Sequence, residues 1–158
     1  MALLHMSINA RDPEGVSAFL ASLLGGEALP FPPFPESWIA FSGTDDGTAI
    51  EVYPLTHRLV AGESQVECRT QKAADEPTFA HIALATDLTA DAVLALAGEL
   101  DWPARRSNRG PFHCIEVWIE ERLLIEVLDP EMRADYRAGM TMQNWRAMFD
   151  MDRPDRES

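Results

Sequence analysis

"FAHIALATD", residues 79–87, is the stretch that decides the fold, because residues 3–12, "LLHMSINARD", repeat its pattern. In both segments a histidine stands early in an apolar run, and an aspartate follows six or seven residues later. A glutamate closes each unit: Glu51 follows His5 by 46 positions, and Glu126 follows His81 by 45. The sequence therefore predicts two copies of one module, each of which begins with a strand histidine and ends with a strand glutamate.

Strand and helix signals follow the same order in both modules. Residues 3–9 alternate between apolar and polar side chains, as in a half-buried strand, and Asp12 is a typical N-cap for a helix that ends at Leu24. We expect further strands at Trp38–Phe41, Ala49–Tyr53, Phe112–Glu120 and around Glu126, a helix near Thr89–Leu100, and a loop at Arg105–Pro111. This order predicts an α+β fold with two βαβββ modules at residues 1–55 and 79–130, a linker at 56–78, and a C-terminal extension at 131–158 with one or two short helices.

The composition excludes several classes of partner. The chain carries 26 acidic and 13 basic residues among 158, a formal net charge of −13, so it lacks the Lys and Arg excess that nucleic acids and anionic membranes attract. No apolar run approaches the roughly 20 residues that cross a bilayer, and no signal-peptide pattern begins the sequence, so we expect a cytoplasmic protein. Cys68 and Cys114 match no metal or redox spacing and are expected to be free thiols.

Four titratable residues are predicted to share the sheet face that is turned away from the helices. Apolar residues flank Glu51 and Glu126 and point to the opposite face, and the same parity separates His5 and His81 from their apolar neighbours. A carboxylate on an enclosed sheet face needs a partner that offsets its desolvation, and a divalent metal is an efficient one. Two imidazoles and two carboxylates therefore predict a metal site, with a ligand set that suits Zn, Ni, Co, Fe or Mn and leaves positions open for water or substrate.

The segments LLHMSINARD, AIEVYP, FAHIALATD and LLIEVLDP resemble the four ligand strands of the vicinal oxygen chelate superfamily, on its glyoxalase I branch. The resemblance covers about residues 3–130 and implies a pair of βαβββ modules whose mixed sheets form a cup around a divalent metal. It assigns the metal to His5, Glu51, His81 and Glu126, with Zn, Ni or Co expected before Fe or Mn. It also implies a small-molecule substrate and a homodimer, in which the modules pair either within one chain or between two.

The resemblance implies lyase or isomerase chemistry of the glyoxalase type, which moves a proton next to a carbonyl. A ligand carboxylate, Glu126 or its counterpart Glu51, would carry that proton. Glutathione is not implied, because Asn9 and Leu55 occupy the two positions that hold it in glyoxalase I. The expected substrate pocket consists of Ser7, Asn9, Trp38, Tyr53, Glu116 and Trp118.

Two alternatives stay open. An extradiol-type dioxygenase would hold Fe(II) with His5, His81 and Glu126 and would leave Glu51 without a role. A non-catalytic binding or resistance protein would hold no metal and would bind a small molecule among its aromatic side chains, namely Phe31, Phe34, Trp38, Tyr53 and Trp118. The metal content of the purified protein separates these hypotheses.

Overall fold

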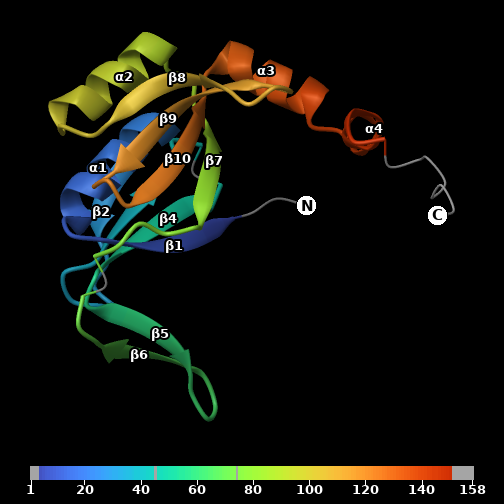
Figure 1. Ribbon diagram of the computed structural model, residues 1–158. Helices are drawn as coiled ribbons and strands as arrows, with labels where there is room; N and C mark the ends of the chain where they lie inside the picture. The colour runs from blue at the N-terminus through green and yellow to red at the C-terminus, as the bar shows by residue number, and fades with distance from the viewer. Residues whose placement is uncertain (1–3, 45, 74, 151–158) are drawn as a thin grey trace, which may run out of the picture.

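Two four-stranded mixed sheets, each formed by one module, make up the body of the protein in the computed structural model, which describes residues 4–44, 46–73 and 75–150 (Figure 1). The first module contains β1 (His5–Ala10), α1 (Pro13–Leu24), β2 (Glu27–Pro30), β3 (Trp38–Phe41) and β4 (Ala49–Pro54). The second contains β7 (His81–Ala85), α2 (Ala90–Glu99), β8 (Ala104–Asn108), β9 (His113–Ile119) and β10 (Leu123–Leu128). The predicted α+β class and the two βαβββ modules are therefore confirmed. Residues 1–3 of the first module and 151–158 of the C-terminal extension lie outside the described residues.

Both sheets have the same topology. The strand orders are β1-β4-β3-β2 and β7-β10-β9-β8. In each sheet the first and last strands of the module pair in parallel, and the remaining neighbours pair antiparallel. This places the strand that carries the histidine directly beside the strand that carries the glutamate.

The module helices begin and end where the sequence indicates. The Asp12 carboxylate accepts a hydrogen bond from the backbone N–H of Gly15 at the start of α1, and Thr89 caps α2 in the same way. Gly25 ends α1 with a φ of 62°, a left-handed conformation that glycine adopts without a steric penalty. One face of α1 is buried, and its apolar side chains are at most 3% exposed: Val16, Phe19, Leu20 and Leu23.

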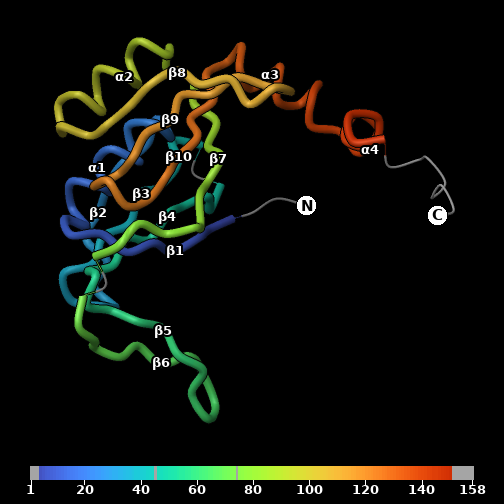
Figure 2. Tube along the Cα trace, viewed as in Figure 1, coloured from blue at the N-terminus to red at the C-terminus, as the bar shows by residue number. Residues whose placement is uncertain are grey.

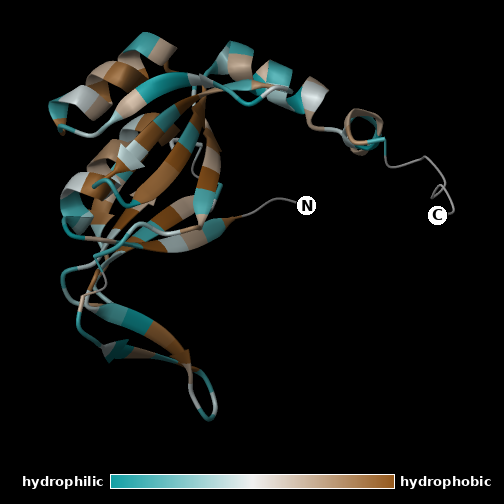
Figure 3. Ribbon diagram, viewed as in Figure 1, coloured by the Kyte–Doolittle hydropathy of each residue, from teal (hydrophilic) through white to brown (hydrophobic). Residues whose placement is uncertain are grey.

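The two modules share one apolar core. Figure 3 shows the apolar segments concentrated in the strands of both sheets. Phe19 of α1 meets Trp102, which follows α2, edge to face at 5.0 Å between ring centroids. The Thr86 hydroxyl, which is buried, donates a 2.6 Å hydrogen bond to the carbonyl of Leu23. These contacts fix the second module against α1 of the first.

A buried carboxylate also joins the modules. Glu120, in the turn after β9, accepts hydrogen bonds from the backbone N–H groups of Arg11 at 2.7 Å and Asp12 at 2.8 Å. The Arg11 side chain donates back to the carbonyl of Glu120 at 2.8 Å. Because a buried carboxylate without donors is costly, these hydrogen bonds specify how the two modules pack within one chain.

Three strands, β5, β6 and β8, form where the sequence predicted irregular structure. β8 occupies part of the predicted loop Arg105–Pro111. It is an edge strand and needs few apolar residues, so its sequence carries no strand pattern. The linker contains an antiparallel hairpin of β5 (His57–Ala61) and β6 (Val66–Thr70), which projects from the body (Figure 1). Backbone hydrogen bonds hold the hairpin together, and its strands lack the apolar periodicity by which a strand is predicted from sequence.

The C-terminal extension forms two helices, as expected: α3 (Pro130–Gly139) and α4 (Met142–Met148). α3 packs on β9 and β10, with Met132 buried and Asp129 as the N-cap. The chain trace in Figure 2 shows that the β5–β6 hairpin and α4 leave the body at opposite ends. Within the described residues, no helix combines the length and the apolar character that crossing a bilayer requires.

Candidate metal centre

The histidine and the glutamate of each module lie in equivalent registers. Ser7 is the partner of Glu51 across β1 and β4, so His5 lies two residues before that partner. Ala83 is the partner of Glu126 across β7 and β10, so His81 also lies two residues before it. Side chains two residues apart share a face of a strand, and each histidine therefore shares a face with its glutamate. We call these pairs the N-terminal half-site (His5 and Glu51) and the C-terminal half-site (His81 and Glu126).

The two half-sites lie on separate sheets. Across the described ranges, no group of three or more His, Cys, Asp and Glu side chains is placed to hold a metal ion. One chain therefore presents the four predicted ligands as two pairs, and the single four-ligand cluster expected from the sequence is not assembled within it.

Neutral hydroxyls orient the carboxylate of the N-terminal half-site. Oε2 of Glu51 accepts hydrogen bonds from the Ser7 hydroxyl at 2.7 Å and the Tyr53 hydroxyl at 2.8 Å. Burial and the hydrogen bond to Glu51 raise the pKa of Tyr53, so its hydroxyl stays protonated and remains a donor. No donor of the described residues reaches Oε1 of Glu51, and His5 is exposed. One carboxylate oxygen and one imidazole are thus free to bind a metal.

The remaining pocket residues of the first module divide between the two faces of their sheet. Asn9 uses its side-chain amide to donate to the carbonyls of Pro54 and His57, at 3.0 and 3.1 Å, and so holds the base of the β5–β6 hairpin. The ring of Tyr53 packs against Phe34 at 5.3 Å between centroids. Trp38 does not belong to the site, because its register partner is Val52, on the face opposite to Glu51.

An arginine holds the carboxylate of the C-terminal half-site. Glu126 is 7% exposed, and its Oε1 accepts a 2.7 Å ion-paired hydrogen bond from Nε of Arg109. The same guanidinium reaches Oε1 of Glu116 at 2.8 Å, and Arg105 contacts Oε2 of Glu116 at 2.6 Å. The hydrogen bond to Glu126 is the main cause that raises the pKa of Arg109. Two arginines therefore balance two glutamates at this half-site.

Because Arg109 already offsets the desolvation of Glu126, the burial of this carboxylate does not by itself require a metal. Glu116 was expected in the pocket, and its register partner is Glu126, so both carboxylates share one face. Trp118 belongs to that face as well. Arg109 is the residue that the sequence analysis missed. A signal was present, since Arg105, Arg106 and Arg109 cluster within a predicted loop of an otherwise acidic chain.

The cysteine nearest to this half-site is not a candidate ligand or nucleophile. Both cysteines are free, as expected, and Cys114 is fully buried on β9. Burial, with a smaller contribution from the negative charge of Glu126, raises the pKa of Cys114 to about 11. Its thiol therefore stays protonated at neutral pH.

The C-terminal half-site opens on a cavity, whereas the cavity beside the N-terminal half-site is lined by neither His5 nor Glu51. Ser7, Asn9 and Tyr53 form part of a cavity of about 310 Å³ together with the β5–β6 hairpin. His81, Arg109 and Glu126 line a second cavity, of about 320 Å³, whose other wall comes from the C-terminal extension. The two cavities differ in their walls although the half-sites share one register.

The sequence matches no protein-family model, and no curated protein is significantly similar to it. Solved structures do resemble it. A variant of the fosfomycin resistance protein FosX from Listeria monocytogenes, complexed with Mn(II) and 1S,2S-dihydroxypropylphosphonic acid, is 18% identical with a TM-score of 0.53, over 93% of this chain and 97% of FosX. Glyoxalase I from Leishmania major is 16% identical with a TM-score of 0.52, over 92% of this chain and 99% of its own. Lactoylglutathione lyase from Agrobacterium tumefaciens is 15% identical with a TM-score of 0.51, over 80% and 91%.

This chain has the vicinal oxygen chelate fold. The resemblance inferred from the four histidine and glutamate segments is thus confirmed at the level of the fold. The vicinal oxygen chelate fold explains why the two half-sites repeat one register, since each is built by the first and last strands of one βαβββ module. The Mn(II) and the phosphonate belong to that FosX complex.

Proposed function

We propose that this protein is a metal-dependent enzyme of the glyoxalase type, a lyase or isomerase that moves a proton next to a carbonyl on a small oxygenated substrate. One observation carries the proposal: each module places its histidine two residues before the register partner of its glutamate. Two unrelated structural roles for these residues would not require the same offset in both modules. The fold shared with FosX and two glyoxalases supports the proposal.

The metal site is proposed to form in a homodimer. His5 and Glu51 of one copy would meet His81 and Glu126 of a second copy, since the described part of one chain presents two ligands at each half-site. Two imidazoles and two carboxylates suit Zn, Ni or Co, and Fe or Mn would also be accepted. When bound, a divalent metal acts as a Lewis acid that stabilises negative charge on a substrate oxygen.

Side chains of this protein would transfer the proton and orient the carboxylates. Glu126 is proposed to take the proton from the carbon next to the carbonyl and to return it to the neighbouring carbon, with Glu51 as its counterpart. Ser7 and Tyr53 fix the orientation of Glu51 through its Oε2. Arg109 holds Glu126 at the mouth of its cavity. Asn9 is engaged with two backbone carbonyls, so we propose a substrate other than a glutathione conjugate.

The test combines metal analysis with complementation between two variants. We expect about one transition metal per chain in the purified protein, and its loss in His5→Ala and in His81→Ala. Chains of the two variants, coexpressed with different tags and purified as a mixed dimer, would contain one undamaged site if ligands come from both copies. The mixed dimer should then bind half as much metal per chain as the parent protein. An arrangement within one chain predicts no metal in the mixed dimer, because each chain carries one damaged ligand.

A non-catalytic binding protein is the second candidate, and the Arg109–Glu126 ion pair favours it. This pair offsets the burial of Glu126 without any metal. A protein that carries no metal, and takes up none when Zn, Ni, Co, Fe or Mn is added, would support this candidate over the enzyme. Fe as the bound metal would instead support the extradiol-type dioxygenase.

A further inference from the structure

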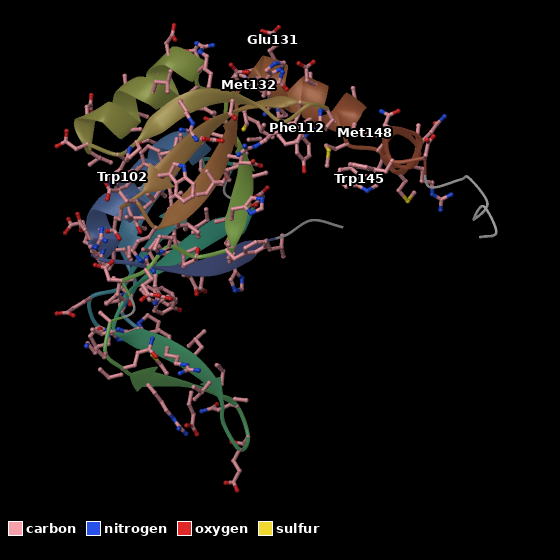
Figure 4. All side chains as sticks on the ribbon, viewed as in Figure 1. Trp102, Phe112, Glu131, Met132, Trp145 and Met148 are labelled. Atoms are coloured by element: carbon pink, nitrogen blue, oxygen red, sulfur yellow. The ribbon has the colours of Figure 1, made fainter. Side chains whose placement is uncertain are left out.

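The cavity at the C-terminal half-site has one polar and one apolar side. His81, Arg109 and Glu126 form the polar side. The apolar side comes from the β8–β9 loop and from the C-terminal extension: Phe112, Tyr136, Met140, Trp145, Met148 and Phe149. Figure 4 shows Phe112, Trp145 and Met148 on the same side of the α3–α4 segment. A volume of about 320 Å³ lies near the lower end of the roughly 300–1,000 Å³ typical of ligand pockets, so it suits a compact molecule.

The apolar side is built from two aromatic pairs. Phe112 and Tyr136 meet edge to face at 4.6 Å between ring centroids, which attaches α3 to the loop before β9. Trp145 and Phe149 of the α4 segment meet at 4.9 Å, yet they remain 42% and 54% exposed. The first pair anchors the wall, and the second presents flat apolar surface to the cavity. Exposed aromatic surface beside a polar cluster is typical of a binding site.

The position of α4 beside the cavity is specified by its elbow with α3. A Cβ atom added at Gly139 would lie 2.3 Å from the carbonyl oxygen of Pro111, so the close approach of these two backbones requires glycine. The Asn144 side chain donates to the carbonyls of Ala138 at 2.8 Å and Gly139 at 3.2 Å. Thr141 caps the new helix by accepting from the backbone N–H of Asn144 at 3.2 Å. The elbow therefore directs α4 back towards the mouth of the cavity.

We propose that the C-terminal extension is the specificity wall of the site, and that the substrate carries an aromatic ring next to its anionic, chelating oxygens. The ring would lie against Trp145 and Phe149, where stacking and burial of apolar surface favour it. The acidic oxygens would face the polar side of the cavity at His81 and Arg109, where Arg109 also pairs with Glu126. The chelating part of this inference rests on the proposed function; the aromatic part depends only on the cavity and the α3–α4 segment.

The test uses two probes that share a carboxylate and a neighbouring hydroxyl and differ in the ring. Salicylate carries a benzene ring, and lactate carries a methyl group. Calorimetric titrations of the full chain, with and without Zn²⁺, should give salicylate a Kd at least about tenfold lower than that of lactate. Trp145→Ala and Phe149→Ala should each weaken salicylate binding about tenfold and leave lactate unchanged, as expected for the loss of one aromatic contact.

The control is Met142→Ala, a residue of the same helix that is 85% exposed and lies outside this cavity. It should leave the binding of both probes unchanged. Equal affinities for salicylate and lactate, or salicylate binding that neither aromatic variant weakens, would overturn the inference. A dimer that dissociates in Trp145→Ala would also overturn it, because α4 would then be a contact between copies.

The two proposals fail in different ways. Salicylate binding that depends on Trp145 in a protein that takes up no Zn²⁺ would support the aromatic wall and defeat the metal-dependent function. Stoichiometric Zn²⁺ binding without a preference for salicylate would support the metal-dependent function and defeat the aromatic wall.

Discussion

Replacing Arg109 by Met tests whether this arginine holds the two buried carboxylates of the C-terminal half-site. Glu116 and Glu126 would lose the guanidinium that contacts them at 2.8 and 2.7 Å, while Met keeps much of the apolar stem. Removing one partner of a buried ion pair typically costs about 3–5 kcal/mol. Because the Arg109 side chain is 32% exposed, solvent screening reduces this, and we expect a loss of about 2–4 kcal/mol in the free energy of unfolding.

Urea denaturation of the metal-free protein measures this change. With a slope of about 2 kcal/mol per molar urea, the midpoint should fall by about 1–2 M. Zn²⁺ should bind about tenfold more tightly to the variant, because Glu126 no longer engages a charged donor whose hydrogen bond is worth about 1.5 kcal/mol.

Arg105→Met is the matched control for this experiment. Arg105 contacts Glu116 at 2.6 Å but is 73% exposed, and Arg109 remains in place beside both carboxylates. An exposed ion pair contributes about 0–1 kcal/mol, so the control should change the midpoint little and leave Zn²⁺ affinity unaltered. An unchanged midpoint in metal-free Arg109→Met would refute the reasoning. Weaker Zn²⁺ binding in that variant would show that Arg109 supports the metal site.

Three further predictions follow from the geometry. Burial alone would raise the pKa of Glu116, but a hydrogen bond from Ser107 and the nearby arginines outweigh burial and lower this pKa. In urea unfolding at pH 7, Glu116→Gln should therefore destabilise the protein by about 1–3 kcal/mol. This difference in stability should shrink as the pH falls below 4.5, the ordinary pKa of a glutamate. A thiol reagent at pH 8 should label one cysteine of the native protein, the partly exposed Cys68, and should reach Cys114 only in denaturant; rapid labelling of both would contradict the burial of Cys114. Gly139→Ala should displace the end of α3 from Pro111 and lower the melting temperature by several degrees, whereas Gly98→Ala, where an added Cβ meets no atom, should not lower it.

The local signals of the sequence determined most of the secondary structure. Alternation along residues 3–9 predicted β1, and the Asp12 cap predicted the start of α1. These features depend on a residue and its near neighbours, so periodicity and capping reveal them. The repeat at His81 then carried the same order of elements into the second module, and with it the α+β class.

The register that pairs each histidine with a glutamate was also implicit in the sequence. The two spacings from histidine to glutamate, 46 and 45 positions, place His5 and His81 at equivalent points of the repeat, however the two modules pack together. Which face each pair occupies follows from the parity of its strands. The half-sites could therefore be predicted one at a time.

Only the tertiary structure decided how these pieces combine. It placed the half-sites on two sheets, because each module closes its own sheet, and it packed the modules together through the Glu120 and Thr86 contacts. It supplied Arg109 as the partner of Glu126, from an edge strand and loop whose side chains carry no periodic signal. It also directed Trp145 towards the C-terminal cavity through hydrogen bonds at the α3–α4 elbow. The module packing and the Arg109–Glu126 ion pair join residues distant in sequence, so the local pattern of the chain does not encode them.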